Sequence, residues 1–310
     1  MSVTRIIFGC GYLGLRVGKR WRQSGDHTIA VSRYEQLGPV PTPAGAAGMF
    51  TATGDVTQPA TLEWMETHFG QRGVMGTPLE SLLYAVGYDR TSNANIHSVY
   101  AGGLQNVLAA LPCPVTRAIY ISTTGVYGTA GGEWVDEGTP TDPQREGGRA
   151  SLAAERVLAE HPLGTRSAIL RLAGIYGPGR VPYIDKLRAG EPLAVPSAGW
   201  LNLIHVDDAA RIVVAVDRWL AARELSDGPH VFCVSDGTPV QRGEYYAKVA
   251  RLIGAPPPAF TTPPPGSPAA ARAGSDRRVS NAKLLREVGV TLEYPSYHQG
   301  LAAILQAPDF

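Results

Sequence analysis

The sequence predicts an α/β protein built on a doubly wound parallel sheet, with a smaller lobe in its C-terminal part. Short apolar runs alternate with segments in which apolar residues recur every three or four positions, the order expected of strand, crossover helix and parallel strand. The first apolar run is also followed by a glycine-rich turn and then by a helical pattern. The chain has 310 residues, of which 44% are hydrophobic, and is therefore long enough to bury a large core.

The predicted elements follow one another in regular order. Runs typical of strands buried on both faces cover residues 4–8, 27–32, 48–53, 81–86, 117–122 and 166–172. Segments with a single apolar helical stripe separate most of these runs and cover residues 12–25, 94–111 and 151–160. After Gly174 this alternation stops, and we expect the proline-rich residues 255–275 to form a surface loop.

Charge and cysteine content restrict the partners and the location. The formal net charge is +1 and no Lys/Arg run exceeds two residues, so we expect a small-molecule partner rather than nucleic acid or a membrane surface. Cys10, Cys113 and Cys233 are widely spaced in apolar contexts, which favours reduced core thiols and a cytoplasmic protein. The chain reaches its first predicted strand without a leader pattern, and no apolar run is as long as a membrane span.

The glycine-rich turn "FGCGYLGLRVG" is the first motif with chemical meaning. Gly9, Gly11 and Gly14 form a G-x-G-x-x-G pattern between a strand and a helix, the context in which this pattern indicates dinucleotide binding in a Rossmann fold. Gly9 permits the tight turn, Gly11 lets a diphosphate approach the backbone, and Gly14 lets the helix pack on the strand. The amides at the start of the helix then face the anion.

The end of the second predicted strand indicates which dinucleotide binds. An NAD site usually has an Asp or Glu there for the ribose hydroxyls, whereas this chain has Ser32 and Arg33. A guanidinium makes charge-assisted hydrogen bonds to phosphate, so this pair favours the 2′-phosphate of NADP. Glu35 keeps NAD open as an alternative. Asp55, after the third strand, is a candidate acceptor for the adenine amine or an ordinary turn residue.

We therefore expect residues 1–173 to form a dinucleotide-binding domain to which residues 200–235 return. Residues 174–199 and 236–310 then form the smaller substrate lobe. The helices predicted at 92–111 and 151–160 are candidate faces for a homodimer.

Several segments together carry a resemblance. Besides the glycine turn and Asp55, they are "YAVG" (84–87), "STTGVYG" (122–128), "RLAGIYGPGR" (171–180), "LIHVDDAARIV" (203–213) and "RRVSNAKL" (277–284). From about Arg5 to about Leu305 the chain resembles an extended short-chain dehydrogenase/reductase of the NAD-dependent epimerase/dehydratase family, nearer to its atypical branch. The resemblance implies cofactor contacts at Gly9, Gly11, Tyr12, Leu13, Gly14, Ser32, Arg33, Asp55, Val56, Ala85, Val86, Gly87, Ala173 and Ile175.

The catalytic residues that this family uses are only partly present. The family pattern of Ser/Thr, Tyr and Lys implies that Thr123 orients a substrate oxygen. The places of the Tyr-x-x-x-Lys pair are held by Gly147 and Ser151, neither of which can supply a phenol or an ammonium group. The usual mechanism cannot operate unchanged, and Tyr127, in the same loop as Thr123, is our candidate proton donor.

Other polar residues follow predicted strands, where a doubly wound sheet places its ligand. Tyr88, Tyr176 and Arg180 are candidate substrate contacts. We expect His205 to cap the following helix and Asp89 to pair locally with Arg90. The seven histidines are scattered and no Cys/His pair has ligand spacing, so we expect no metal.

Three functions fit the sequence. The leading one is an NADP-dependent oxidoreductase of the atypical extended class, acting on a small carbonyl, alcohol or sugar-derived substrate. The second is a non-catalytic NAD(P)-binding sensor of redox state or ligand level, which the missing Tyr and Lys would permit. The third is an NDP-sugar epimerase or dehydratase.

Overall fold

The computed structural model describes residues 3–34, 48–68, 78–111, 115–128, 131–267, 269–270 and 276–306. The chain divides into two compact units. Unit 1 comprises Met1–Thr123, Glu146–Arg171 and Ala210–Val231, and unit 2 comprises Thr124–Arg145, Leu172–Ala209 and Phe232–Phe310. Each unit is therefore assembled from segments that are far apart in the sequence.

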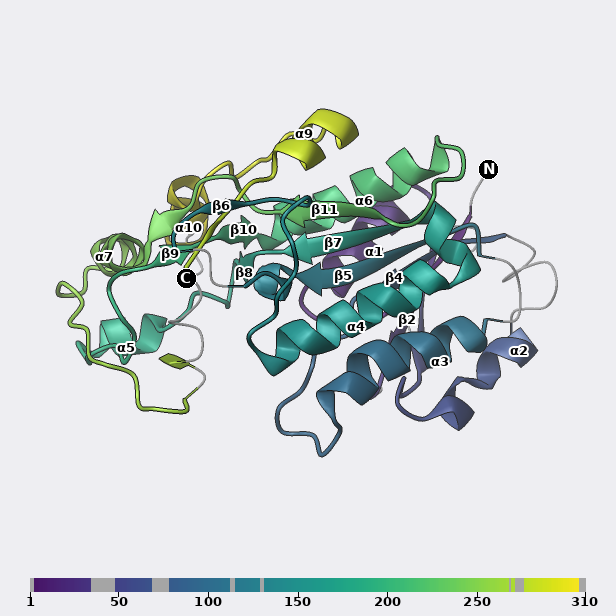
Figure 1. The fold of residues 1–310 in the computed structure, drawn as a ribbon, viewed down its shortest axis with the longest axis horizontal. Coiled ribbons are helices and arrows are strands. Elements are labelled where there is room, and N and C mark those ends of the chain that lie inside the picture. Colours follow the sequence, from purple (N-terminus) through teal and green to yellow (C-terminus); the bar gives the residue numbers. More distant parts are fainter. Residues whose placement is uncertain are drawn as a thin grey trace. The chain divides into compact units, whose positions relative to one another are not determined.

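A seven-stranded sheet in the order β11-β7-β5-β4-β1-β2-β3 forms the centre of the fold (Figure 1). Its strands are β1 (Thr4–Phe8), β2 (His27–Ser32), β3 (Met49–Thr53), β4 (Leu79–Tyr84), β5 (Arg117–Thr123), β7 (Ser167–Leu172) and β11 (His230–Val234). The pairs β1–β2, β2–β3, β1–β4 and β4–β5 are parallel. The strand order reverses between β1 and β4, so the predicted doubly wound parallel sheet is confirmed.

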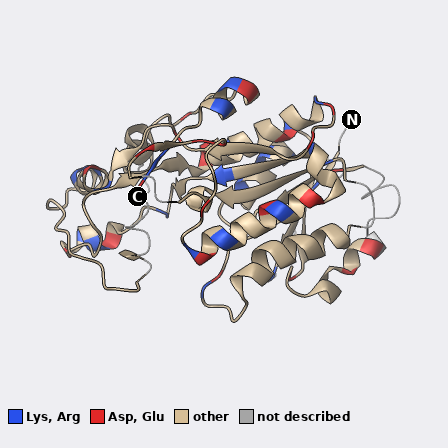
Figure 2. Ribbon diagram, in the orientation of Figure 1, with Lys and Arg blue, Asp and Glu red and all other residues tan. Residues whose placement is uncertain are grey.

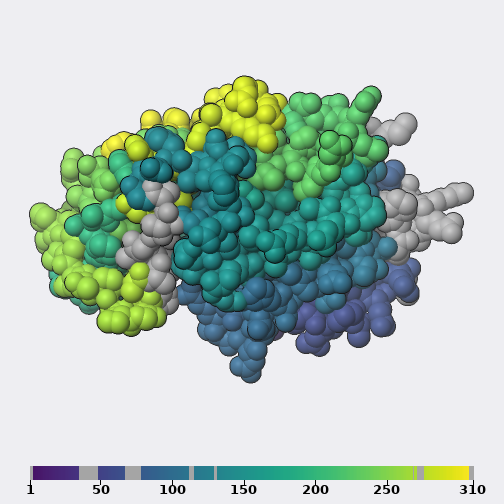
Figure 3. Space-filling model, in the orientation of Figure 1, coloured from purple at the N-terminus to yellow at the C-terminus, as the bar shows by residue number. Residues whose placement is uncertain are grey.

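Helices cover both faces of this sheet. They include α1 (Gly14–Gln23), the short α2 (Trp64–His68), α3 (Gly103–Ala109), α4 (Glu146–Glu160) and α6 (Val206–Ala221). Figure 1 shows α3 and α4 on the near face, and in the space-filling view of Figure 3 their side chains hide most of the strands. On the other face α1 and α6 are joined by a hydrogen bond from Arg218 to Ser24 of 2.9 Å. Single 3₁₀ turns lie at Pro59–Leu62, Thr124–Val126 and Pro162–Arg166.

One predicted helix differs in form. Residues 94–111 contain a π-helical turn, Ser98–Gly102, which leads directly into α3. The hydroxyl of Tyr84 donates a hydrogen bond of 2.6 Å to the carbonyl of Val99 in this turn. At Gly103 a Cβ atom would lie 2.4 Å from the same hydroxyl, so the glycine lets α3 pack directly against β4. The core of unit 1 continues from there through apolar side chains of the strands, α3 and α4.

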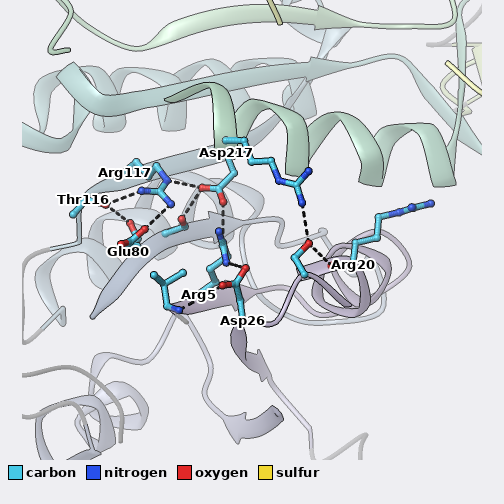
Figure 4. Close-up of polar contacts among 11 residues, drawn as sticks. Arg5, Arg20, Asp26, Glu80, Thr116, Arg117 and Asp217 are labelled. Carbon is cyan, nitrogen blue, oxygen red and sulfur yellow. Dashed lines mark hydrogen bonds and ion pairs between the residues drawn. The ribbon is translucent and has the colours of Figure 1, made fainter. Parts of the chain in front are cut away.

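A buried ionic network holds α6 against the amino-terminal edge of the sheet (Figure 4). Asp217 of α6 is fully buried and accepts hydrogen bonds from Arg5 Nε (2.8 Å), Arg117 Nε (2.7 Å) and Ser81 Oγ (2.6 Å). Arg5 also pairs with Asp26, and Arg117 with Glu80. Three strands and one helix therefore share a single buried carboxylate, and removing it would leave two arginines without their common partner.

Unit 2 has its own small sheets and core. Three two-stranded sheets pair β10 (Leu203–His205) with β8 (Gly174–Tyr176), β12 (Val240–Gln241) with β9 (Trp200–Leu201), and β13 (Arg278–Val279) with β6 (Trp134–Val135). Its helices are α5 (Ile184–Arg188), α7 (Arg242–Leu252), α9 (Ala282–Val288) and α10 (Tyr297–Leu305). An aromatic-rich core lies between α7 and α10 and includes Tyr176, Tyr245 and Tyr297.

Charged residues of both signs are distributed over the described helices. Figure 2 shows acidic and basic residues mixed on the same helices, as the net charge of +1 leads one to expect. Within the described ranges, no helix is both long and apolar enough to span a membrane.

Candidate dinucleotide site

The turn after β1 has the geometry that the glycine pattern predicts. Gly9 has a φ of +91°, and a Cβ atom there would lie 2.4 Å from the carbonyl oxygen of Ala85. At Gly14 a Cβ atom would lie 2.4 Å from the carbonyl oxygen of Gly9. At Gly11, in contrast, it would meet nothing within 4 Å. Two glycines are thus needed for packing, whereas no protein atom crowds the middle one, as the dinucleotide-binding pattern requires.

The first turn of α1 is electrostatically suited to an anion. Its N-cap, Leu13, provides no side-chain hydrogen bond, and no acidic residue lies in the first turn. Arg16 in this turn donates a hydrogen bond of 2.8 Å to the carbonyl of Tyr12 and lies 4.4 Å from the centre of the Tyr12 ring. Arg16 was not among the predicted cofactor contacts. A cation at the positive end of a helix is unfavourable alone and becomes favourable when an anion binds beside it.

The end of β2 carries the residues predicted to recognise the adenosine ribose. The Ser32 hydroxyl donates to the carbonyl of Tyr34 at 2.6 Å. Arg33 forms an ion pair of 3.1 Å with Asp89, the residue expected to pair with Arg90. That expectation was wrong, because the carboxylate of Asp89 is turned back toward the end of β2. Glu35 lies outside the described residues.

The neighbouring strand ends complete the edge of the site in unit 1. Ala85 donates from its amide to Phe8 at 2.8 Å, which places the residues after β4, including Val86 and Gly87, beside the glycine turn. Asp55 caps its own turn, because its Oδ1 accepts hydrogen bonds from the amide (2.9 Å) and hydroxyl (2.7 Å) of Thr57. Val56 is buried and its carbonyl accepts from Asn106. The two readings of Asp55 are compatible, since a carboxylate fixed in a turn can still accept from adenine.

Comparisons with known proteins identify the family. The model of the NAD-dependent epimerase/dehydratase family matches residues 6–230. The chain belongs to this family. Protein YeeZ of Escherichia coli (strain K12) is 32% identical over 187 residues, which are 60% of this chain and 62% of YeeZ, less than two thirds of its length.

Solved structures agree with this membership. One from Methylobacillus flagellatus, assigned to the NAD-dependent epimerases/dehydratases, has a TM-score of 0.74 and 32% identity and covers 98% of each chain. WbmG of Bordetella bronchiseptica, solved in complex with NAD and UDP, has a TM-score of 0.74 over 98% of this chain and 94% of its own. Its 19% identity shows the shared fold only. The resemblance to the epimerase/dehydratase family is thus confirmed.

The positions of the epimerase family's Tyr-x-x-x-Lys pair both lie on α4. At Gly147 a Cβ atom would have a single near neighbour, Ile96 Cδ1 at 3.8 Å, so the structure leaves room for a side chain at this position. Ser151 is buried and lies beside Tyr120. Arg149, between them, donates to Glu146, whose other oxygen lies 2.5 Å from His97 Nε2.

Tyr100 is a further candidate residue that was not predicted from the sequence. It lies in the π-helical turn, beside the backbone of Tyr88 in the loop after β4. Burial raises the pKa of Tyr100, while Arg90 acts in the opposite direction. Its phenol thus lies at the carboxyl edge of the sheet, the edge at which a doubly wound fold binds its ligand. Irregular π-turns are frequent at functional sites, but this turn is visible only in the structure.

Thr123 and Tyr127 differ in how accessible they are. Thr123 ends β5 and is partly exposed. Tyr127, in unit 2, is 1% exposed, and its hydroxyl lies 3.1 Å from the sulfur of Cys233. A phenol buried to this degree is a less accessible proton donor than Tyr100, and the role of Tyr127 stays a prediction from the sequence.

The remaining candidate residues divide between buried and exposed. Tyr88 donates its hydroxyl to the carbonyl of Ala94 at 3.2 Å. Tyr176 is fully buried and contacts His205 edge to face at 5.3 Å, so it packs the core of unit 2, whereas Arg180 is exposed. The resemblance implies two cofactor contacts here: Ala173, which directly precedes β8, and Ile175, which lies within β8.

His205 Nδ1 accepts the amide of Asp207 at 3.3 Å, so the predicted helix cap is present. Among the described residues, no group of three or more His, Cys, Asp or Glu side chains is arranged to hold a metal ion.

Proposed function

We propose that the protein is an NADP-dependent oxidoreductase of the atypical extended short-chain dehydrogenase/reductase class. Its substrate is a small carbonyl, alcohol or sugar-derived compound. The open space at Gly11, between two glycines that packing requires, is the observation that supports the proposal most strongly. Arg33 favours NADP over NAD because it directly follows β2, where the 2′ position of the adenosine ribose lies in such folds, and its guanidinium can bind the 2′-phosphate.

Separate groups of residues are proposed to bind the cofactor and to orient the substrate. The amides at the start of α1 and the guanidinium of Arg16 bind the diphosphate, and Arg33 with Ser32 binds the 2′-phosphate. When bound, the nicotinamide ring supplies or accepts the hydride. Thr123 orients the substrate oxygen by a hydrogen bond. Ala173 and Ile175 are proposed contacts of the same cofactor.

We assign the proton to Tyr100. Its phenol lies against the loop after β4, and α4 offers no phenol or ammonium at Gly147 and Ser151. Arg90 lowers the pKa of the Tyr100 phenol by its positive charge, which is the electrostatic role that the family's lysine would have. Tyr88 and Arg180 are the proposed substrate contacts.

We also propose that the protein is cytoplasmic and forms a homodimer. Cys10 and Cys233 are free and buried, and burial raises the pKa of Cys10 to about 11, so its thiol is unreactive and fits a cytoplasmic protein. A homodimer through the exposed sides of α3 and α4 is part of the same proposal, and analytical ultracentrifugation measures it.

The decisive assay follows the absorbance of the reduced nicotinamide with NADP(H) and a panel of aldehydes, ketones, alcohols and sugars. Turnover of one class supports the oxidoreductase, and Thr123→Val should lower that turnover while leaving cofactor affinity nearly intact. Arg33→Asp should weaken NADP far more than NAD, and equal losses would refute the assigned preference.

Two alternative functions have their own signatures in this assay. Tight cofactor binding without any oxidation or reduction favours a sensor, which the loss of the pair on α4 would permit. Binding of uridine or thymidine diphosphate together with a retained cofactor favours an NDP-sugar epimerase or dehydratase. The UDP in the WbmG structure is the observation behind that alternative.

A further inference from the structure

The ion pair between Arg33 and Asp89 connects two strand ends that are not neighbours. Arg33 follows β2 and Asp89 lies in the loop after β4, and in the sheet β1 stands between those two strands. The guanidinium Nη2 lies 3.1 Å from Asp89 Oδ2, with both side chains about one-third exposed, at 31% and 36%. The pair therefore runs from one side of the glycine turn to the other.

The carboxylate of Asp89 is also fixed by residues other than Arg33. Its Oδ1 accepts hydrogen bonds from the amide (2.9 Å) and the hydroxyl (2.6 Å) of Thr91. These hydrogen bonds and the neighbouring Arg33 lower the pKa of Asp89 below its usual value, so the group is charged at neutral pH. Arg33 thus faces a fixed anion on the same polypeptide.

The 2′-phosphate of NADP would bind the same guanidinium group of Arg33 that pairs with Asp89. In a fold with this strand order, the diphosphate lies on the turn after β1 and the adenosine ribose at the end of β2. Arg33 can direct its fork of N–H groups to the carboxylate or to the phosphate, and a free carboxylate near the phosphate repels it. NAD, which has a hydroxyl at the 2′ position, does not compete for the arginine in this way.

We propose that Asp89 is a specificity-determining residue, which weakens the binding of the 2′-phosphate by holding Arg33 and so limits the preference for NADP over NAD. This inference rests on the proposed function, because it requires a dinucleotide on the turn after β1. It assigns a role in recognition to a residue of the loop after β4, on the far side of β1 from the ribose.

Calorimetric titration of NADP and NAD into four variants tests it: wild type, Asp89→Asn, Arg33→Gln and the double variant. Asp89→Asn should tighten NADP about fivefold, the equivalent of one partly exposed ion pair, and change NAD less than about twofold. In the Arg33→Gln background the gain should fall below about twofold, since the remaining repulsion then acts through solvent. Asp136→Asn is the matched control, because Asp136 also caps an exposed turn, through Gly138 and Thr139.

Each outcome decides between the inference and the function it rests on. If wild type binds NADP and Asp89→Asn binds it no more tightly, the inference is refuted and the proposed function stands. If the gain persists in full without Arg33, Asp89 acts by repulsion alone and the inference is again refuted. If the wild-type protein binds neither NADP nor NAD, the inference and the proposed function are both refuted. Thermal unfolding of each variant shows that it is folded.

Discussion

Replacing Gly11 by alanine separates the binding role of the glycine turn from its structural role. A Cβ atom at Gly11 meets no protein atom within 4 Å, and Gly11 is not among the glycines with positive φ. The variant should fold as well as wild type or gain about 0.4–1 kcal/mol, because alanine has fewer unfolded conformations than glycine. The methyl group takes the space in which the diphosphate would meet the backbone amides.

The expected loss of affinity can be estimated from the contacts that the methyl group would prevent. A hydrogen bond to a charged group contributes about 1.5–3 kcal/mol, so losing one such bond lowers NADP affinity about 10- to 150-fold. Isothermal calorimetry measures the affinity and thermal unfolding measures the stability. Undiminished NADP binding by Gly11→Ala would refute the placement of the diphosphate.

Gly14→Ala is the matched control for packing. The new methyl carbon would lie 2.4 Å from the carbonyl oxygen of Gly9 and 3.2 Å from Ile7 Cγ2, so α1 would have to move away from β1. Such overpacking costs about 1–3 kcal/mol and should lower the unfolding midpoint. A variant as stable as wild type would show that the close approach of α1 to β1 is not required.

Three further predictions concern the proton donor, the buried ions and pH. Tyr100→Phe should lower turnover about 100-fold or more with cofactor affinity unchanged, and an unaffected rate would exclude this phenol as the donor. Asp217→Asn should destabilise the protein by about 3–5 kcal/mol in chemical denaturation, because two buried arginines lose their shared carboxylate. The control Asp185→Asn, at an exposed ion pair, should change the free energy of unfolding by less than about 0.5 kcal/mol. Similar effects of the two substitutions would contradict a stabilising role of the ionic network. Burial, and the nearby Asp208, raise the pKa of Asp236 to about 7, and its Oδ2 has no hydrogen-bond partner. Since the folded state then binds the proton more tightly than the unfolded state, stability from this group should fall as pH rises from about 4 to 7, by at most about 4 kcal/mol, and Asp236→Asn should remove that slope.

Local sequence features predicted the first half of the sheet closely. The strands β1 and β2 begin and end where the apolar runs do, because turn residues bound those runs directly. The strand β4 was predicted at 81–86 and lies at Leu79–Tyr84, since Ala85 and Val86 leave the strand to pass Gly9. The seventh strand, β11, was not predicted. Its pairing depends on contacts far along the chain, which no local pattern reports.

The parts of the site that local sequence could not predict depend on long-range pairing. The glycine turn was predictable because its spacing is local. Arg33 was predicted as an anion contact, but its partner Asp89 lies 56 residues away and was expected to pair with its neighbour. In the ionic network, Arg5 and Asp217 are separated by 212 positions, and nothing in an apolar strand marks an arginine as buried. The π-turn that carries Tyr100 likewise depends on Tyr84, in a different element.

Calorimetry of the wild-type protein with oxidised and reduced NAD and NADP tests the central claim most directly. We expect saturable binding of a dinucleotide with a stoichiometry of one per chain, tighter for NADP than for NAD, and a matching rise in the unfolding temperature. Absence of both heat and thermal shift with all four dinucleotides would contradict the assignment of the turn at Gly9–Gly14 as a dinucleotide site.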